Sequence, residues 1–375
     1  MALVGTINAP NDFGFTNRII NGAMVIDQRN VGASKTYSAA EGVYNVDRWQ
    51  AGAIGGGTFT TQQMNSANTS ASNYEASSAP TGFTNSLKIT VGTADTSLAS
   101  SDRYSIYQYI EGNNVQDLDF GIATAKTVTV SFWTKSSVVG TFGVYLSNAA
   151  FSRSIPSTFT INAINTWEYK TITFVGDVTG TWLKGDTTGL VLGFSFAMGT
   201  TYQGTKDTWA ATAYFTTSSQ TNFMATSSNT FYITGVQLEK GATATSFGYR
   251  SYTTELQLCQ RYCYVFRSDA VATFSNIGFA SVFDNINAHV GVTLPVPMRI
   301  VPTITYSSIS DLAIHAPGLV RIALSTFSVN TNQSSNIRAV VGATTASNAN
   351  FVNLRACHCE FNGTSVGWLA FGSEL

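Results

Sequence analysis

Short segments in which apolar and polar residues alternate dominate this chain. Residues 126–133 (KTVTVSFW) and 169–175 (YKTITFV) show the pattern most clearly. A period of two places the apolar side chains on one face of an extended strand, as in a half-buried antiparallel sheet. Further segments of this kind begin at Ser86, Arg103, Phe142, Leu190 and Phe231. Turn residues separate the segments, so the sequence predicts an all-β protein built on a β-sandwich rather than alternating strands and helices.

Helical periodicity is confined to residues 252–266 (YTTELQLCQRYCYVF), which we expect to form one short helix at a domain junction. Apolar side chains recur there at spacings of three and four: Leu256, Cys259, Cys263 and Phe266. Two segments rich in small polar residues, 52–79 and 216–229, are expected to be loops.

We therefore divide the chain into three parts, with the main boundary near residue 250. Residues 1–18 show no clear pattern and are expected to be an N-terminal arm or connector that orders by contacting a partner. Residues 19–250 are expected to form the sandwich. Residues 251–375 are expected to form a smaller β-rich C-terminal domain, where the prolines after Val290 limit the strands to edges or bulges.

The charge balance argues against nucleic acid as a partner. The 375 residues include only 11% charged residues, against roughly 25% in an average soluble domain, and the formal net charge is -1. Scattered cations cannot displace many phosphate counterions. A neutral surface instead favours short-range contacts, and aromatics at 12% supply stacking surface as well as core.

The start of the chain, MALVGTINAP, lacks the basic and apolar segments of a secretory signal. The longest apolar runs, such as the one from Leu190, are too short to span a bilayer. We therefore expect a protein made in the cytoplasm, without membrane insertion.

Several motifs, in order along the chain, carry a resemblance to a known family. IINGAMVIDQRN (19–30) and YNVDRWQ (44–50) resemble the opening of a module common in bacteriophage tail fibres. KTVTVSFWTKSS (126–137), NTWEYKTITFVGD (165–177) and FYITGVQLEKGATATSF (231–247) are similar to the jelly-roll sandwich that these fibres share with carbohydrate-binding modules. ELQLCQRYCYVF and LPVPMRIVPTITY resemble the terminal domain that follows it. Together these stretches bracket roughly residues 19 to 306.

The resemblance implies a homotrimeric tail fibre in the virion, made in the host cytoplasm. Such a protein is displayed to the host and binds a cell-surface glycan or another envelope component. It implies that residues 1–18 attach to other phage tail proteins, and it requires no cofactor. The implied fold is a jelly-roll-like β-sandwich followed by the smaller terminal domain.

Paired carboxylates are the main enzymatic possibility, because glycoside hydrolysis generally uses two of them. Asp117 and Asp119 alternate on what reads as one strand face, Asp177 and Asp186 flank a turn around Trp182, and Glu111 precedes a glycine. Turn capping or solvation explains each of these equally well. The only histidines that could serve a serine nucleophile as a base are His289, His315 and His358. We therefore predict no catalytic residues.

The Cys357-His358-Cys359 segment is the one candidate for a metal. On a strand the two cysteines share one face and His358 points away, which suits a pair of core thiols better than tetrahedral zinc. A disulfide from Cys259 to Cys357 or Cys359 outside the cell stays open. No dense run of Asp and Asn indicates calcium. We predict no metal site.

Aromatic residues beside turns are the candidates for sugar binding, since the flat C–H faces of sugars pack on aromatic rings. Trp182, Tyr202 and Trp209 are the candidates in the sandwich, and Trp368 is the candidate in the C-terminal domain. Packing beneath a loop or at a subunit contact is the alternative for all four. The remaining tryptophans are expected in the core: Trp49, Trp133 and Trp167.

Three hypotheses follow for function. The first is a non-enzymatic receptor-binding tail fibre. The second is a structural virion component, such as a capsid decoration or baseplate protein. The third is a glycan depolymerase, which release of reducing ends from host polysaccharide would reveal.

Overall fold

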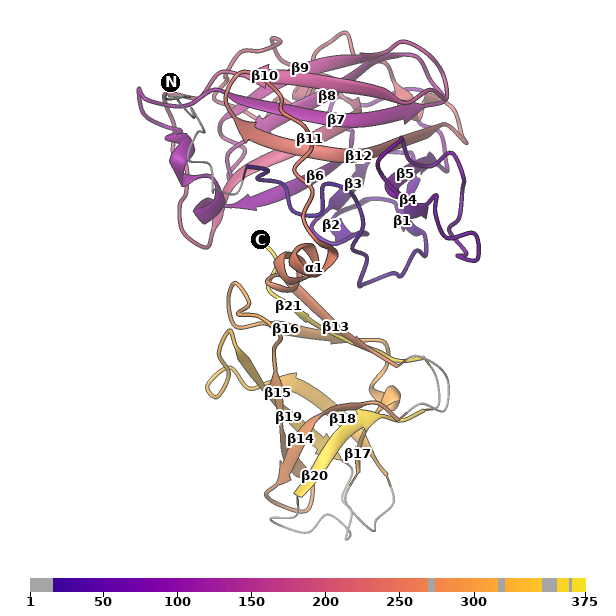
Figure 1. The fold of residues 1–375 in the computed structure, drawn as a ribbon, viewed down its shortest axis with the longest axis vertical. Helices are drawn as coiled ribbons and strands as arrows, with labels where there is room; N and C mark the ends of the chain where they lie inside the picture. The colour runs from indigo at the N-terminus through magenta and orange to yellow at the C-terminus, as the bar shows by residue number, and fades with distance from the viewer. Residues whose placement is uncertain (1–15, 269–273, 316–320, 346–355, 364–365) are drawn as a thin grey trace, which may run out of the picture. The chain divides into compact units, whose positions relative to one another are not determined.

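The computed structural model describes residues 16–268, 274–315, 321–345, 356–363 and 366–375. Two compact units, Met1–Arg250 and Ser251–Leu375, make up the chain. Both are built from antiparallel strands, which confirms the predicted all-β class (Figure 1). No helix among the described residues is long and apolar enough to cross a bilayer.

In the first unit two antiparallel sheets face each other as a jelly-roll-like sandwich. Sheet A has the order β1 (Lys35–Tyr37), β4 (Phe59–Asn65), β5 (Asn85–Val91), β12 (Thr230–Lys240), β7 (Val128–Ser136) and β10 (Glu168–Phe174). Sheet B has the order β2 (Ala40–Tyr44), β3 (Gln50–Ile54), β6 (Arg103–Glu111), β11 (Thr188–Met198), β8 (Gly140–Ser147) and β9 (Ser154–Ile161). Short 3-10 turns lie between strands: η1 (Gly112–Asn114), η2 (Gln116–Leu118), η3 (Thr200–Tyr202) and η4 (Phe223–Ala225).

Aromatic side chains fill the space between the two sheets. The ring of Phe132 on sheet A lies 4.9 Å from that of Phe194 on sheet B and 5.0 Å from that of Phe159, all in edge-to-face geometry. Such pairs contribute beyond their buried area. The alternation of β7 explains this core, because Val128, Val130 and Phe132 point inward.

Hydrogen bonds and an ion pair join residues 19–30 to residues 44–50 around Trp49, which is buried as expected. The indole N–H of Trp49 donates to the carbonyl of Asn21 at 3.1 Å. The Asn21 amide in turn donates to the carbonyls of Ile26 and Asp47. The carboxylate of Asp47 also pairs with Arg29 at 3.1 Å. These residues therefore fix the local chain path rather than form a binding surface.

Two details of the sandwich differ from the sequence expectations. Residues 52–79 contain the end of β3 and all of β4, because their polar side chains find hydrogen-bond partners elsewhere in the unit: the Gln63 amide donates to the Met24 carbonyl at 2.7 Å. The packing of this unit also includes the last residues of the expected arm. Asn17 is buried, and the Arg18 backbone N–H donates to the Leu238 carbonyl at 2.9 Å. Residues 1–15 of the arm lie outside the described residues.

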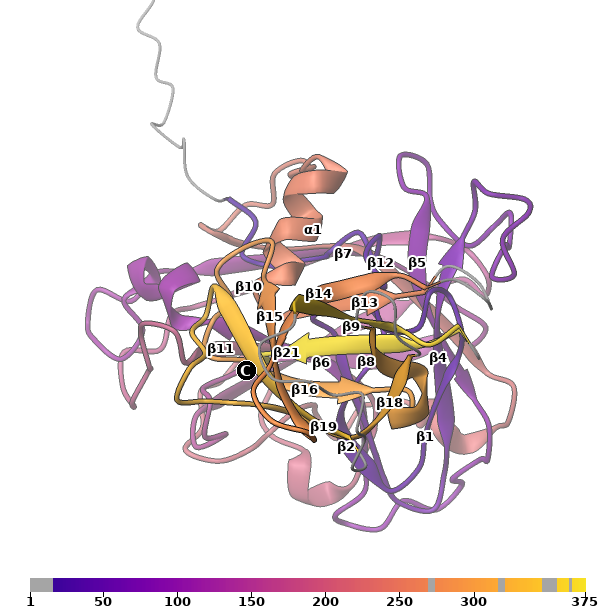
Figure 2. The same ribbon diagram turned by 90° about the horizontal axis from the view of Figure 1, so that it is seen from below.

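The second unit begins with helix α1 (Tyr252–Gln260), which Ser251 caps by accepting from the backbone N–H of Thr254. The helix is shorter than the predicted 252–266, because the aromatic and β-branched residues after it form strand β13 (Cys263–Arg267). β13 pairs with β21 (Trp368–Gly372), which also pairs with β16 (Thr303–Tyr306). Figure 2 shows β21 between its two partners.

The rest of this unit is a closed barrel. Its strands follow the order β14 (Asn276–Val282), β15 (Asn287–Thr293), β19 (Arg338–Thr345), β18 (Ile322–Val329), β17 (Leu312–His315) and β20 (Ala356–Phe361), and the turn η5 (Ile309–Asp311) precedes β17. The proline-containing segment that follows Thr293 forms no strand until Thr303, in line with the limits that prolines impose.

Candidate ligand-binding site

The outer face of sheet B carries a pocket of about 220 Å³. Strand β6 builds one side of it, since alternate side chains of this strand point outward. They are Arg103, Ser105, Tyr107 and Tyr109. The side chains between them, such as Tyr104 and Ile106, belong to the sandwich core. The period of two therefore separates core from pocket within one strand.

Three residues in register across sheet B determine the floor. Gly193 on β11 lies directly opposite Tyr107 on β6 and Tyr145 on β8. A Cβ atom on Gly193 would lie 2.2 Å from Cζ of Tyr145, so the absent side chain is what allows the Tyr145 ring to occupy this place. Tyr107 and Tyr145 thus form the floor, and Gly193 lies beneath the Tyr145 ring.

The loop after β11 supplies the wall. Phe215 from this loop packs on Tyr145 with ring centroids 4.5 Å apart, and Tyr202 stacks on Phe215 at 5.3 Å with an interplanar angle of 10°. The Phe215 backbone is held in place by a hydrogen bond from the Ser195 hydroxyl to its carbonyl at 2.9 Å. Phe151, from the turn between β8 and β9, meets Phe215 edge to face at 5.6 Å. The pocket is therefore enclosed mainly by aromatic faces.

One end of the pocket is charged. Arg103 pairs with Glu41 through two hydrogen bonds, one of them from Nη2 to Oε2 at 2.8 Å. Its Nη1 also donates to the Tyr202 hydroxyl at 2.5 Å. A hydrogen bond from Arg103 to Glu41 raises the pKa of the guanidinium further, so this residue stays cationic at every physiological pH. The opposite charge of Glu41 offsets it.

The tyrosine hydroxyls supply neutral hydrogen-bonding groups. Burial raises the pKa of Tyr107, Tyr109 and Tyr145, so all three remain protonated at neutral pH. The Tyr107 hydroxyl accepts from the Gly42 backbone N–H at 3.1 Å and keeps its own proton to donate. Among the described residues, the Tyr109 hydroxyl has no hydrogen-bond partner. The pocket therefore offers aromatic faces, neutral hydroxyls and one balanced ion pair.

The size of the pocket limits how much of a ligand it can enclose. At about 30 Å³ per water, 220 Å³ corresponds to roughly seven waters. This lies below the range of roughly 300–1,000 Å³ that is usual for drug-sized ligands. One small ring fits such a space better than an extended chain does, although the open side allows more to project from it.

Of the predicted site residues, Tyr202 lines this pocket. Trp182 and Trp209 do not, because they pack on Phe120 elsewhere in the first unit. Both indole N–H groups donate to backbone carbonyls, that of Trp182 to Thr179 at 3.0 Å and that of Trp209 to Val175 at 2.9 Å. The hollow beside Trp182 measures about 10 Å³, too small for a sugar ring. Ligand binding by these residues stays a prediction.

Trp368, the fourth predicted residue, is half-buried in β21 of the second unit. It lies opposite Arg267 of β13 in the strand register. The expectation that Trp133 and Trp167 lie in the sandwich core was wrong. Both are half-buried: the Trp133 ring packs on Tyr169 at 5.3 Å, and the Trp167 indole N–H donates to the Ser77 carbonyl. Phe132, next to Trp133, is the aromatic residue of that strand that enters the core.

Most of the pocket was not predicted from the sequence. The lining residues that were not singled out are Glu41, Arg103, Ser105, Tyr107, Tyr109, Tyr145, Phe151, Ala213 and Phe215. Two signals were present in the sequence: aromatic residues on both faces of the 103–111 strand, and Gly193 between the large apolar residues Leu192 and Phe194. A glycine at such a position often marks close approach by another group.

The candidate carboxylates have structural partners instead of forming a pair. Asp117 lies on the turn η2 and not on a strand, as had been expected, and it binds Arg18 at 2.9 Å and Lys240 at 3.3 Å. Asp119 follows with a left-handed backbone (φ 56°), which also excludes a strand. Asp177 is buried and accepts two hydrogen bonds from Arg153, at 2.7 and 2.6 Å.

The cysteines follow the expectation from strand periodicity. Cys357 and Cys359 on β20 are both buried in the barrel core, while His358 between them is half-buried on the other face. Cys259 and Cys263 are buried as well. The two strand cysteines are thus packing residues of the barrel.

Comparisons with known proteins give only weak similarities. No protein-family model matches the sequence, and no curated protein matches it. Among solved structures, the enzymatically active domain of tailspike protein 4 from Bacteriophage CBA120 is 10% identical with a TM-score of 0.30. The match covers 60% of this chain and 22% of that chain, so the chain spans less than a quarter of the tailspike length.

Two further structures belong to carbohydrate-binding modules. A CBM4 structure is 17% identical with a TM-score of 0.27, and the match covers 59% of this chain and 98% of that chain. The family 11 carbohydrate-binding module of the cellulase Lic26A-Cel5E of Clostridium thermocellum is 13% identical with a TM-score of 0.27, covering 57% and 98%. Scores this low support no conclusion about the site or its ligand.

Proposed function

We propose that this protein is a receptor-binding fibre protein of a bacteriophage tail, which binds a neutral glycan of the host surface in the pocket on sheet B. The motifs between residues 19 and 306 support the tail-fibre part of this proposal through their resemblance to such proteins. The chemistry of the pocket supports the ligand class.

The observation that carries the proposal is the aromatic lining with neutral hydroxyls at its edge. A sugar ring presents a flat C–H face, which can pack on the ring of Tyr202, and hydroxyl groups around its rim. The hydroxyl of Tyr109 and the Arg103 and Glu41 pair offer donors and acceptors for that rim. The balanced charge favours a neutral sugar over a strongly acidic one.

The pocket has too few carboxylates for glycoside hydrolysis, which fits binding without catalysis. Glu41 is the only Asp or Glu among the residues that line it, and Arg103 already holds its carboxylate. Hydrolysis of a glycosidic bond generally needs two carboxyl groups on opposite sides of the bond. The proposal therefore includes no hydrolase activity.

The proposed assembly is a homotrimer in the virion tail, made in the host cytoplasm and attached to other tail proteins through residues 1–18. These features rest on the resemblance alone. The mass of the purified protein in solution tests the trimer directly.

The test is binding of the purified, fluorescently labelled protein to host cells and to their extracted surface glycans. We expect saturable binding that Tyr202→Ala weakens by at least roughly tenfold, because the variant loses a stacking face and the hydroxyl that Arg103 binds. Tyr109→Phe, which removes a single hydroxyl, should weaken binding less. The control is Tyr169→Ala, which removes a 44% exposed tyrosine from sheet A and should leave binding unchanged.

Other outcomes would point to the alternative functions. If the protein does not bind host cells or glycans, a structural role in the virion becomes the better account. If it releases reducing ends from host polysaccharide, it is a depolymerase. If Tyr202→Ala and Tyr109→Phe both leave binding unchanged, the ligand binds outside this pocket. Trp182, Trp209 and Trp368 are then the remaining candidates.

A further inference from the structure

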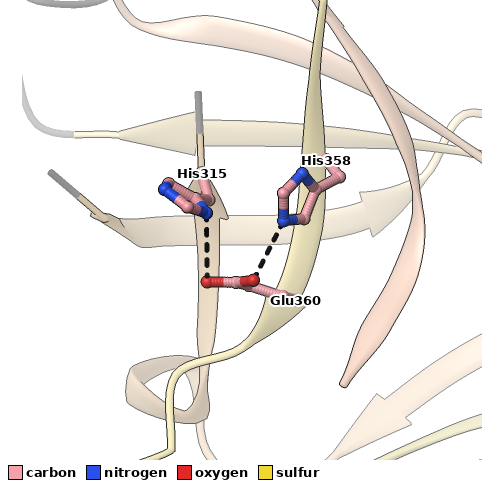
Figure 3. A group of neighbouring side chains, drawn as sticks. All are labelled: His315, His358 and Glu360. Carbon is pink, nitrogen blue, oxygen red and sulfur yellow. Dashed lines mark hydrogen bonds and ion pairs between the residues drawn. The ribbon is translucent and has the colours of Figure 1, made fainter. Parts of the chain in front are cut away.

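Three side chains that could bind a metal converge on the outer face of the barrel. His315 on β17 lies directly opposite His358 on β20, and Glu360 follows His358 by two residues on the same face. Figure 3 shows both imidazoles turned toward the Glu360 carboxylate. His358, the residue of the Cys357-His358-Cys359 motif that lies outside the barrel core, belongs to this cluster.

The strand period creates the cluster. Cys357 and Cys359 point into the barrel, so His358 and Glu360 must point outward. The antiparallel register then brings His315 from the neighbouring strand beside them. The site is made by backbone pairing, which is a rigid way to position ligands.

The distances between the three side chains are close to those between the ligands of a bound metal ion. His358 Nε2 lies 3.0 Å from Glu360 Oε2, and His315 Nδ1 lies 3.8 Å from Glu360 Oε1, which is too long for a hydrogen bond. One ligand atom from each residue lies within 4.8 Å of the other two. Ligands about 2.1 Å from a tetrahedral zinc ion are separated by about 3.4 Å, so adjustments of about an ångström in side-chain position would suffice.

Burial and access also suit a bound ion. The Glu360 side chain is only 4% exposed, whereas those of His315 and His358 are 30% and 29% exposed. The carboxylate is therefore fixed at the base, and an ion can enter from solvent between the two imidazoles. The two rings lie 5.1 Å apart, nearly perpendicular.

Among the described residues, Arg321 is the cation that competes for Glu360. Its Nε donates to Glu360 Oε1, and its guanidinium lies 3.6 Å from the centre of the Phe274 ring. This contact occupies Oε1, whereas Oε2 contacts His358 Nε2, at 3.0 Å, and an ion bound between these two atoms would replace that hydrogen bond. An outer partner of this kind orients a ligating carboxylate.

We propose that His315, His358 and Glu360 bind a first-row divalent transition metal such as Zn²⁺. Two imidazoles and a carboxylate form a set that such ions prefer over Ca²⁺ and Mg²⁺, which take oxygen ligands. A water would complete the coordination sphere. This proposal departs from the expectation of no metal site, and it does not depend on the sheet B pocket.

The test is a Zn²⁺ titration of the tag-free, full-length protein in competition with a chromophoric chelator. We expect one ion per chain, and affinity at least roughly tenfold lower in His315→Ala, His358→Ala and Glu360→Gln. The matched control is His289→Ala, because His289 packs on Phe283 of the barrel and lies outside the cluster. This variant should bind Zn²⁺ like the wild type.

A second readout guards against variants that fail to fold. Co²⁺ bound to the wild-type protein should give visible bands without the near-ultraviolet charge-transfer band of a thiolate ligand, since the cysteines take no part. Absence of binding at excess Zn²⁺, a thiolate band, or affinity that survives the His315→Ala/His358→Ala double variant would each overturn the proposal.

Discussion

The ring of Tyr145 lies over Gly193, at a place where even a methyl group would come within 2.2 Å of the ring. The two residues are cross-strand partners on β8 and β11. Phe215 then packs on Tyr145, and Tyr202 packs on Phe215. One missing side chain thus determines the position of a stack of three rings.

Gly193→Ala should therefore damage both the pocket and the fold. The Tyr145 ring must move or the strands must separate, and we expect the free energy of unfolding to fall by about 1–3 kcal/mol, as in other overpacked sites. Urea denaturation measures this. The control is Gly56→Ala, because nothing lies within 4 Å of a Cβ there, and it should leave stability unchanged or raise it by up to about 1 kcal/mol. Equal stability of the two variants would contradict this account of the floor.

Trp182→Ala and Trp209→Ala should affect stability more than ligand binding. The two rings lie 5.5 Å apart and both contact Phe120, so truncation of either removes one of the packing partners of the other. Since both are half-buried, we expect a loss of about 2 kcal/mol for each, with host adsorption retained by the folded variants. Loss of adsorption at wild-type stability would instead favour the direct sugar contact that their turn context indicated.

Acid should remove one defined contribution to stability at the loop between β9 and β10. Burial alone would raise the pKa of Glu168, but hydrogen bonds from Lys170 and from the backbone N–H groups of Ala163 and Asn162 outweigh it and lower the pKa from 4.5 to about 2. A carboxylate with a lowered pKa stabilises the folded state above its ordinary pKa, and this contribution is lost as the pH falls from about 4.5 to about 2.

Glu168→Gln tests this contribution. The difference in unfolding free energy between wild type and variant should be constant above pH 4.5 and should shrink steadily below it. Chemical denaturation at several pH values between 2 and 7 measures the difference. A difference that stays the same over the whole range would show that Glu168 contributes through neutral contacts only.

The strands could be predicted from the sequence, but the way they pair could not. Alternation in residues 126–133 and 169–175 indicated β7 and β10 because one face of each is more polar than the other. The floor of the pocket needs Tyr107, Gly193 and Tyr145 in register, and these lie on three strands that are distant in sequence. Local periodicity contains no information about such a register.

The same limit explains the other misassignments. Asp117 and Asp119 alternate like strand residues, but ion pairs with Arg18 and Lys240 hold Asp117 on a turn. His358 was correctly expected to point away from its neighbouring cysteines, but its partner His315 is 43 positions earlier in the numbering and comes beside it only when β17 pairs with β20.

The barrel cysteines should be inert toward thiol reagents in the native protein. Burial raises the pKa of Cys357 and, more strongly, that of Cys359, where the nearby Glu360 charge adds to the effect. Both therefore remain protonated at neutral pH, and a protonated buried thiol is a poor nucleophile. All four cysteines are buried, so we expect slow reaction with a chromogenic disulfide reagent in buffer and rapid reaction in denaturant.

The number of reactive thiols in the denatured protein also tests the disulfide that the sequence left open. Four reactive thiols would exclude this disulfide, whereas loss of two thiols after oxidation would show that it forms. Rapid reaction of the native protein would mean that the barrel opens readily enough to expose Cys357 and Cys359.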